Sequence, residues 1–298
     1  MTQPPLLAGL ELGGTKCNAV LARGDMVIDR ASVPTTTPAA TLAALTDVVR
    51  HWTSSHAIAG LGVASFGPLC LDRSATDYGH IIATPKPGWS NTDVVGHFIG
   101  KLGLPTGFDT DVNGAALAEG EWGAARDCDV HAYVTVGTGV GVGIVIDGQP
   151  LHGRLHPEAG HMRIRRADRL GFEGSCPFHG DCVEGLVSGP AIAARAGVAA
   201  ALVADSDPLW DIVAADIGEL LANLILVLSP RRIVIGGGVL QRRPQLLAMA
   251  RRATQATLNA YLPDQSQDDL AALIVPPHLG LDAGALGATI LAQRMIGP

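Results

Sequence analysis

The sequence predicts an α/β protein made of two related halves. Two segments, "LLAGLELGGTKCNAVLA" (6–22) and "VHAYVTVGTGVGVGIVIDG" (130–148), each have the pattern of a strand, a glycine turn and a second strand. Strand-like and helical segments alternate after both of them, as in α/β folds. The chain of 298 residues is also longer than one small core needs. We therefore expect a duplicated α/β unit, with an N-terminal domain over 1–118 and a C-terminal domain over 119–298.

The first half continues with segments of clear periodicity. Residues 38–55 place apolar side chains at helical spacing, and the almost uniformly apolar residues 58–65 predict a buried strand. Residues 66–92 are rich in Gly, Pro, Asp and Ser, and a loop of that length in a compact domain is often functional. The other elements expected in this half are a strand over 26–34, a helix near 93–102, a strand over 105–110 and a helix over 112–123.

The second half repeats the alternation after its own glycine turn. The elements expected there are helices over 189–203, 209–228, 244–261 and 282–296, and strands over 231–238 and 271–276. We expect the last of these helices to pack back on the N-terminal domain.

Composition and charge argue against several classes of partner. The net charge is −7, and the chain has no basic run and no basic amphipathic helix, so we expect no nucleic-acid partner. The longest apolar run, "LLANLILVL" (220–228), is too short to span a bilayer and contains Asn223, so we expect no membrane partner. The N-terminal residues lack the basic and apolar regions of a signal peptide, which predicts a cytoplasmic protein.

The glycine turns are candidates for phosphate binding. In "ELGGTK", Gly13 and Gly14 let the backbone approach an anion closely, while Thr15 and Lys16 add donors. "GTGVGVG" (137–143) offers the same chemistry in the second half. Either turn alone could be only a tight hairpin, but two at equivalent places favour a phosphate held between the domains. Neither fits the P-loop pattern.

A third glycine segment, "GGGV" (236–239), follows a predicted strand and precedes a helix. That placement suits the base and ribose of a nucleotide packed on glycine backbone. The carboxylates Asp109 and Asp111 stand at the end of another predicted strand, in "FDTDVNG", where they would face the same side. Asp111 could serve in catalysis or could simply be the N-cap of the following helix.

The segment "CPFHGDC" (176–182) concentrates soft ligands. A disulfide, a redox pair, a metal site and coincidence are all possible explanations. The chain has five cysteines, an odd number, and reducing cytosol disfavours a structural disulfide. Cys176, His179 and Cys182 supply three ligands, and structural zinc sites use four in a tetrahedron.

Several of these motifs together resemble a known family. The order "GGTK", "DTDVNGAALAEG", "TVGTGVGVG", "HPEAGH", "CPFHGDCVEGLVSGPA" and "IVIGGGV" is similar to that of the ROK family of sugar kinases and repressors, over nearly the whole chain. The bacterial ROK fructokinases also share "ASFGP" and "TPKPGW". The resemblance implies a two-domain actin-like ATPase (ribonuclease H-like) fold with ATP, Mg²⁺ and sugar in the interdomain cleft, and a homodimer.

The resemblance also implies roles for individual residues. Asp111 matches the general base that takes the proton from the primary hydroxyl of the sugar. The positions that match sugar-binding residues are Gly67, Pro68, Glu158, His161 and Glu184. The positions that match the phosphate loops are Gly13, Gly14, Thr15, Gly137, Thr138 and Gly139, and those that match the adenosine loop are Gly236, Gly237 and Gly238.

The resemblance makes "CPFHGDC" a structural Zn²⁺ site. The family places the fourth ligand at His161, while His156 is a rival by proximity alone. Two positions depart from the family pattern. The first loop usually begins with Asp where this chain has Glu11, which could still reach a hydrated Mg²⁺. Many glucokinase-like members have Asn before the catalytic Asp, and Thr110 here agrees with the fructokinases.

The resemblance implies ATP-dependent phosphorylation of a hexose at its primary hydroxyl, with fructose as the substrate and fructose 6-phosphate as the product. Phosphorylation of glucose or mannose is the alternative within the family. A sugar-sensing regulator is disfavoured, because the first predicted strand starts at residue 6 and leaves no room for an N-terminal DNA-binding domain. A non-catalytic sugar-binding protein would be expected to lose Asp111.

Overall fold

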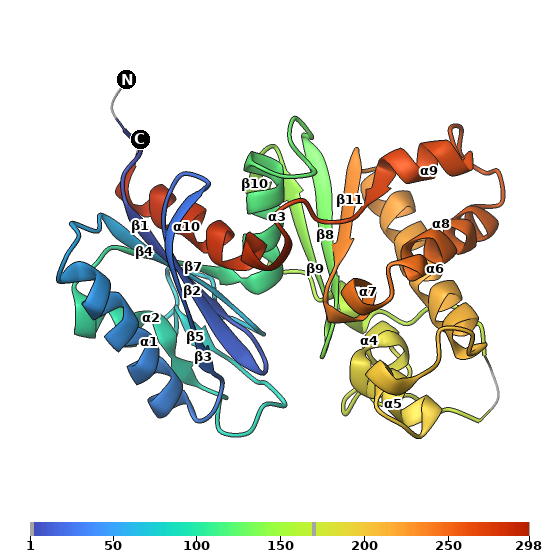
Figure 1. Cartoon of the computed structure of the whole chain (residues 1–298), viewed down its shortest axis with the longest axis horizontal. Helices are drawn as coiled ribbons and strands as arrows, with labels where there is room; N and C mark the ends of the chain where they lie inside the picture. The colour runs from blue at the N-terminus through green and yellow to red at the C-terminus, as the bar shows by residue number, and fades with distance from the viewer. Residues whose placement is uncertain (1–2, 169–170, 298) are drawn as a thin grey trace. The chain divides into compact units, whose positions relative to one another are not determined.

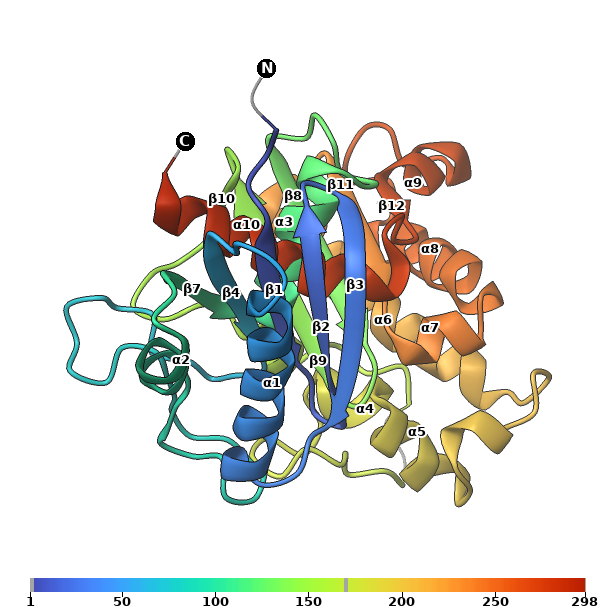
Figure 2. The same ribbon diagram turned by 60° about the vertical axis from the view of Figure 1, so that its left-hand side comes forward.

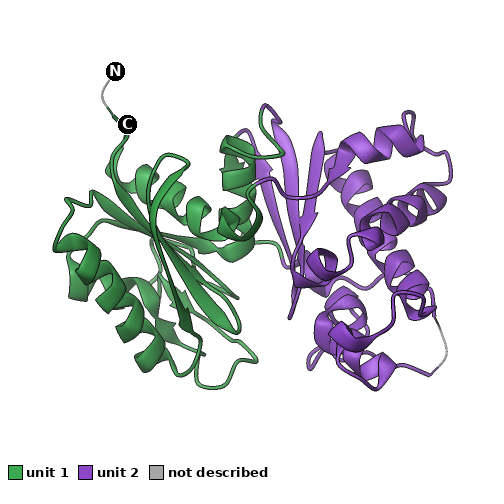
Figure 3. Ribbon diagram, in the orientation of Figure 1, with its two compact units in different colours: residues 1–126, 148–157, 279–298 green, residues 127–147, 158–278 purple. Residues whose placement is uncertain are grey.

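The computed structural model describes residues 3–168 and 171–297 (Figure 1). Contacts divide the chain into two compact units, coloured separately in Figure 3. The first unit comprises Met1–Arg126, Gly148–Pro157 and Leu279–Pro298, and the second comprises Asp127–Asp147 and Glu158–His278. The sequence placed the boundary after residue 118 and the last helix on the N-terminal domain; by contacts the first unit runs to Arg126 and also takes Gly148–Pro157 and Leu279–Pro298.

The sheet of the first unit has the strand order β3-β2-β1-β4-β7. Strands β1, β2 and β3 pair antiparallel, whereas β4 and β7 run parallel to β1. Leu12, Ser65 and Thr110, the last residues of β1, β4 and β7, are paired in register across the sheet. The segments that follow these strands therefore all leave the sheet at one edge.

Helices cover both faces of this sheet. Helices α1 and α2 contact each other on one face, while α3 and α10 contact each other and the parallel strands. Figure 2 shows α1 in front of the strands and α10 behind them. The elements of this unit are β1 (Leu7–Leu12), β2 (Lys16–Arg23), β3 (Met26–Pro34), α1 (Pro38–Thr53), β4 (Gly60–Ser65), β5 (His80–Ile81), β6 (Thr92–Asp93), α2 (Val94–Leu102), β7 (Thr106–Thr110), α3 (Asp111–Glu121), β10 (Gln149–Pro150), η3 (Gly280–Asp282) and α10 (Ala283–Ile296).

A row of glycines allows α10 to lie directly on the sheet. Gly9, Gly62 and Gly107 are paired in register on β1, β4 and β7. A Cβ atom at Gly62 would lie 1.6 Å from the Ala288 carbonyl oxygen of α10, and one at Gly107 would lie 2.2 Å from the Leu291 carbonyl oxygen. Side chains in this row would push the helix away, so the glycines fix how closely it packs.

The second unit is built on strands in the order β9-β8-β11-β12. Strands β8 and β9 form an antiparallel hairpin, and β11 runs parallel to β8 and β12. Thr135 pairs with Gly236, so the glycine segments after β8 and β11 lie at one edge of this sheet. The elements of this unit are β8 (Val130–Val136), β9 (Val140–Ile146), η1 (Ala159–His161), α4 (Val183–Val187), α5 (Gly189–Ala196), η2 (Ala200–Leu202), α6 (Leu209–Leu228), β11 (Arg232–Gly236), α7 (Gly238–Arg242), α8 (Gln245–Leu258), α9 (Gln267–Leu273) and β12 (Ile274–Val275).

Two expected elements of this unit differ from those observed. The helix expected over 189–203 ends at Ala196, because Gly197 takes a left-handed conformation with φ of 70° and caps it. The strand expected over 271–276 is reduced to two residues. Helix α9 takes the residues before it and is started by a capping box between Ser266 and Asp269.

None of the helices within residues 3–168 and 171–297 combines the length and apolar character that a membrane span needs.

The glycine row predicts a large effect of one methyl group. Gly62→Ala should lower the free energy of unfolding by about 1–3 kcal/mol or more, because the backbone of α10 must move to admit the Cβ atom. Gly100→Ala in α2 is the matched control, since a Cβ atom there would meet nothing within 4 Å. Urea unfolding followed by circular dichroism measures both changes. Equal stability of the two variants would contradict the close packing of α10.

Candidate functional site

The carbonyl groups of the first glycine turn, between β1 and β2, accept hydrogen bonds from other residues. The Thr35 hydroxyl donates to the Gly13 carbonyl at 2.7 Å, and the Thr35 N–H donates to the Thr15 carbonyl at 3.0 Å. The Lys86 ammonium donates to the Gly14 carbonyl at 2.5 Å. The N–H groups of Gly13, Gly14 and Thr15 find no acceptor among the residues that the structure describes. These donors can therefore bind an anion such as a phosphate.

Glu11 lies at the end of β1, just before this turn. One oxygen of its carboxylate accepts the Asn18 side-chain N–H at 2.8 Å. Burial raises the pKa of the Glu11 carboxyl, and the charge of Lys16 partly offsets this effect. A Cβ atom at Gly284 of α10 would lie 2.4 Å from the other Glu11 oxygen, so this glycine makes room for the long side chain. Lys16 itself is exposed at the start of β2.

Asp111 is the first residue of α3, and its carboxylate is not needed to cap the helix. Thr110 is the N-cap, and its hydroxyl oxygen accepts the Asn113 N–H at 3.1 Å. The interpretation of Asp111 as an N-cap is therefore wrong. Asp111 accepts the N–H of Val112 at 2.9 Å. Burial raises the pKa of the Asp111 carboxyl to about 7, and the negative charge of Glu11 adds to the increase.

Asp109 has a different environment from Asp111. Its buried carboxylate accepts the Thr110 N–H and the Asn113 side-chain N–H, each at 2.7 Å. The His152 ring nitrogen Nε2 lies 3.0 Å from the second oxygen. The hydrogen bond to Asp109 raises the pKa of His152. Asp109 is thus committed to internal partners, which leaves Asp111 as the carboxylate open to a substrate.

Gly67 and Pro68 follow β4 at the same edge as the first glycine turn. The next residue, Leu69, donates its N–H to Nε2 of the buried His156 at 3.0 Å. A Cβ atom at Gly67 would lie 3.2 Å from the His156 ring. His156 therefore packs against the Gly67–Pro68 segment and helps to hold it in place. His156 and this segment belong to the same unit.

The glycine turn of the second unit, Gly137–Gly139, is closed by a hydrogen bond from the Gly137 N–H to the Gly139 carbonyl at 2.8 Å. Its middle residue, Thr138, is exposed. The Gly137 carbonyl accepts the Gly189 N–H of α5 at 2.7 Å, which fixes the turn to that helix.

The third glycine segment lies beside this turn. Gly236 ends β11 and Gly238 begins α7. Gly237, between them, has a φ of 94°, and a Cβ atom there would lie 2.4 Å from the Val136 carbonyl oxygen. A Cβ atom at Gly137 would lie 3.8 Å from the Gly238 nitrogen. The two glycine segments of this unit therefore lie side by side, with no side chain larger than that of Thr138 between Gly137 and Gly139 or between Gly236 and Gly238.

Glu184 on α4 also contacts the second glycine turn. One of its carboxylate oxygens accepts the Val140 N–H at 3.1 Å. A Cβ atom at Gly139 would lie 2.6 Å from that oxygen, so the turn needs glycine here. Glu158 is exposed at the start of the short helix η1, which ends at His161.

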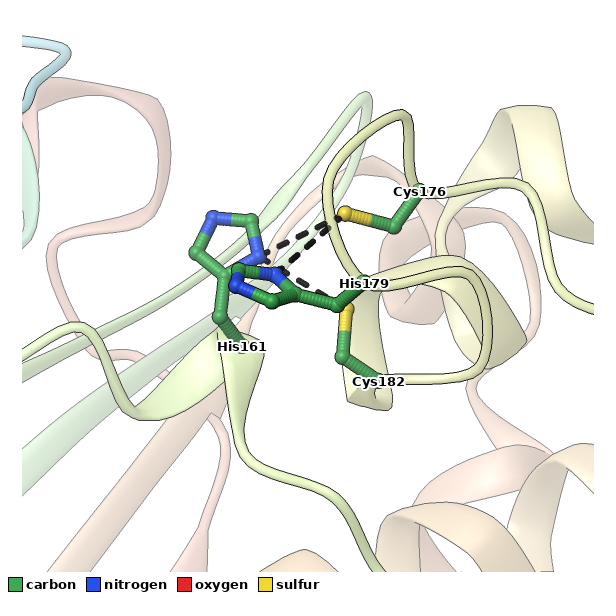
Figure 4. A group of neighbouring side chains, drawn as sticks. All are labelled: His161, Cys176, His179 and Cys182. Carbon is green, nitrogen blue, oxygen red and sulfur yellow. Dashed lines mark hydrogen bonds between the residues drawn. The ribbon is translucent and has the colours of Figure 1, made fainter. Parts of the chain in front are cut away.

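A cluster of soft ligands surrounds one point of the second unit (Figure 4). The Nδ1 atom of His161 lies 3.7 Å from the sulfur of Cys176 and 3.6 Å from that of Cys182. The Nδ1 atom of His179 lies 3.7 Å from the Cys176 sulfur. All four ligand atoms lie within 4.8 Å of one another. A tetrahedron with zinc–ligand bonds of about 2.0–2.3 Å has edges of roughly 3.3–3.8 Å, so the donor set fits this metal.

The same cluster links two predicted sugar-binding residues. His161 and Cys182 belong to segments that pair next to each other, with the Val183 N–H donating to the Met162 carbonyl at 3.0 Å. Glu184 follows Cys182 by two residues. The positions of His161 and Glu184 therefore both depend on the geometry of the Cys/His cluster. His156, the rival ligand, is not part of this cluster.

Sequence reasoning missed two contributors. His156 supports the Gly67–Pro68 segment, although it was weighed only as a metal ligand. Lys86 reaches the first glycine turn from a loop more than seventy residues away, a contact for which periodicity and spacing give no signal. The motif "TPKPGW" contains Lys86 and was the one available indication.

Comparison with known proteins identifies the family. The sequence model of the ROK family matches residues 7–295. The chain belongs to the ROK family. A ROK hexokinase from Thermus thermophilus has the same fold, with a TM-score of 0.77 and 27% identity over 96% of this chain and 97% of that one. This similarity supports the expected actin-like α/β architecture.

Two curated relatives of this ROK protein are named fructokinases. The fructokinase of Zymomonas mobilis is 45% identical over 291 residues, which cover 95% of each chain. The fructokinase of Pediococcus pentosaceus is 40% identical over 98% of this chain and 99% of that protein.

The raised pKa of Asp111 predicts that the ligand-free protein loses stability as the pH rises. Between the ordinary value of 3.8 and about 7, the folded protein binds more protons at this group than the unfolded chain. The contribution to the free energy of unfolding therefore falls over this interval. Asp111→Asn removes the effect and should be more stable than the parent at pH 8, by on the order of 4 kcal/mol, with a much smaller difference at pH 4.5.

Urea unfolding at both pH values, without nucleotide or divalent cations, measures this difference. Asp47→Asn is the control, because the Asp47 side chain is 76% exposed. A constant difference between the parent and Asp111→Asn across this pH range would show that the Asp111 carboxyl is not perturbed.

Proposed function

We propose that the protein is an ATP-dependent fructokinase that converts D-fructose to fructose 6-phosphate. The observation that supports the proposal most is that three candidate segments meet at one edge of the first sheet. The donor-rich first glycine turn, the Gly67–Pro68 segment and the uncommitted Asp111 carboxylate follow three strands whose ends are in register. The two curated fructokinases, 45% and 40% identical to this chain, support fructose as the substrate.

The reaction needs one proton transfer and one phosphoryl transfer. Asp111 accepts the proton of the primary hydroxyl as that oxygen forms a bond to the γ-phosphorus of ATP. The bond from this phosphorus to the bridging oxygen breaks, and ADP leaves with the bonding electrons. A carboxyl with a pKa of about 7 is well matched to a proton transfer near neutral pH. The protein otherwise acts by positioning and by neutralising charge.

Mg²⁺ is expected to accompany ATP, and Glu11 would hold it through water. The Glu11 carboxylate is partly buried beside the first glycine turn, and its negative charge helps to raise the pKa of Asp111. A carboxylate next to phosphate oxygens is the usual setting for Mg²⁺ in proteins. When bound, the ion neutralises phosphate charge and orients the phosphates.

The second unit supplies the remaining predicted contacts. We assign nucleotide binding to the backbone of Gly137–Gly139 and Gly236–Gly238, and contact with the sugar hydroxyls to Glu158, His161 and Glu184. The carboxylate of Glu184 has one oxygen on the Val140 N–H, which holds the side chain in place. A homodimer, which the family resemblance implies, stays a prediction.

The choice of sugar is tested by comparing kcat/KM for fructose and glucose with saturating MgATP. Fructose should be preferred, in agreement with Thr110, whose hydroxyl is engaged in capping α3. Asp111→Asn should lower kcat on fructose by roughly 10²–10⁴-fold, the usual contribution of a general base. Preference for glucose would overturn the fructokinase assignment, and near-normal turnover of Asp111→Asn would overturn the assignment of the base.

We further propose that His161, Cys176, His179 and Cys182 hold one structural Zn²⁺. The ligand separations of 3.6–3.7 Å support this assignment. In the role proposed here the ion acts by fixing the loop, and the Nε2 atom of His161 would remain available to the sugar.

Cys182→Ser should release the zinc and weaken fructose binding, while nucleotide binding is largely kept, because Glu184 and His161 lose their common anchor. Metal analysis should find about one zinc ion per chain in the parent protein. Cys128→Ser is the control, since this cysteine lies outside the cluster. Full activity in a parent protein free of zinc would contradict the proposal.

A further inference from the structure

The motif "TPKPGW" (84–89) forms a compact loop that presents Lys86. Prolines flank Lys86 on both sides and restrict the backbone there. The Lys86 N–H donates to the Thr84 hydroxyl oxygen at 3.4 Å, and the Trp89 N–H donates to the Lys86 carbonyl at 3.2 Å. Trp89 is fully buried and donates its ring N–H to the Thr36 carbonyl at 2.8 Å. The loop is thus anchored at its tryptophan, close to its lysine.

The Lys86 ammonium lies between two parts of the proposed site. It donates to the carbonyl of Gly14 in the first glycine turn at 2.5 Å. It also lies 5.9 Å from the ring centroid of Phe66, the residue that precedes Gly67. One of these neighbours belongs to the turn assigned to the phosphates, and the other adjoins the segment assigned to the sugar. A phosphoryl group passes between these two substrates during the reaction.

The charge of Lys86 is available for a ligand. None of the ion pairs found within residues 3–168 and 171–297 includes it. An ammonium group has three donors, and the Gly14 carbonyl uses one of them. The N–H groups of the same turn find no acceptor in the described chain. A cation and backbone donors at one turn are suited to the same anion.

We propose that Lys86 is a catalytic residue that binds the terminal phosphate of ATP and stays with the phosphoryl group during its transfer. The inference rests on the proposed function. Lys86 transfers no proton in this step, because the hydroxyl proton goes to Asp111 and the bonds that form and break are those described above. Its charge opposes the negative charge on the phosphoryl oxygens, as cationic side chains do in other phosphoryl-transfer enzymes.

A purely structural role for Lys86 is the competing explanation. In that case its hydrogen bond to Gly14 would only hold the glycine turn in shape, and the turn would serve every phosphate of the nucleotide. The two roles differ in their dependence on the terminal phosphate. Loss of a structural contact weakens ADP and ATP alike, whereas loss of a contact to the terminal phosphate weakens ATP alone.

The test compares Lys86→Met with Lys86→Arg and with the control Lys101→Met, which removes an exposed lysine at the end of α2. Calorimetry with Mg²⁺ measures the binding of ADP and of the non-hydrolysable ATP analogue AMPPNP. Lys86→Met should bind AMPPNP about tenfold more weakly, the effect of losing one charge-assisted hydrogen bond. Its ADP affinity should match the parent, and Lys86→Arg should keep most of its AMPPNP affinity.

Steady-state kinetics provide the second measurement. Lys86→Met should lower kcat on fructose by roughly 10²–10³-fold, with KM for fructose nearly unchanged and thermal unfolding as in the parent. Equal weakening of ADP and AMPPNP, a normal kcat, or a parent that does not bind AMPPNP would each overturn the role of Lys86. If the parent binds AMPPNP but phosphorylates neither fructose nor glucose, the proposed function fails, and the comparison of ADP with AMPPNP still decides whether Lys86 contacts the terminal phosphate.

Discussion

The close approach of α10 to the glycine row is the constraint on which the first unit depends. Gly9, Gly62 and Gly107 lie in register on the three strands whose carboxyl ends lead into the proposed site. The helix packs its backbone against them and also contacts α3, which begins with Asp111. Because the interior of a protein resists small displacements, this packing fixes the ends of the strands and the start of α3 relative to one another.

The parallel strands bring several candidate site segments to one edge of the rigid sheet. Each of the first glycine turn, the Gly67–Pro68 segment and α3 starts immediately after a strand of known register, so short loops are enough to bring their polar groups to one edge. Ligands bind at the carboxyl ends of parallel strands in many α/β proteins for this reason. The connection between the short paired strands β5 and β6 then adds Lys86. The buried ring of Trp89 anchors this connection close to the lysine.

The second unit has fewer regular elements near its functional residues and uses other means of support. Glu184 is tied to the Val140 N–H at the second glycine turn, and the Cys/His cluster joins the segments that carry His161 and Glu184. The Zn²⁺ proposed for this cluster would add to the apolar side chains of α4 that are buried beside it, and would hold the loop in place. The first unit thus has rigid strand ends beside its candidate residues, and the second has a loop rich in potential metal ligands.

Much of the architecture was determined by the sequence alone, because it rests on local patterns. The two strand–glycine–strand hairpins, the helices α1, α6 and α10 and the approximate place of the cysteine cluster follow from periodicity and spacing. The same patterns failed at Ala271–Leu273, where a capping box decides for helix over a short apolar run.

Tertiary structure decided what depends on residues distant in sequence. It gave Asp109 and Asp111 different environments. Thr110, Asn113 and His152 are partners of the Asp109 carboxylate, and not of Asp111. It placed His161 with the cysteines and turned His156 toward Leu69. It also brought Lys86 to Gly14. Each outcome depends on which segments the sheets and glycine contacts bring together, and such contacts leave no periodic signal in the chain.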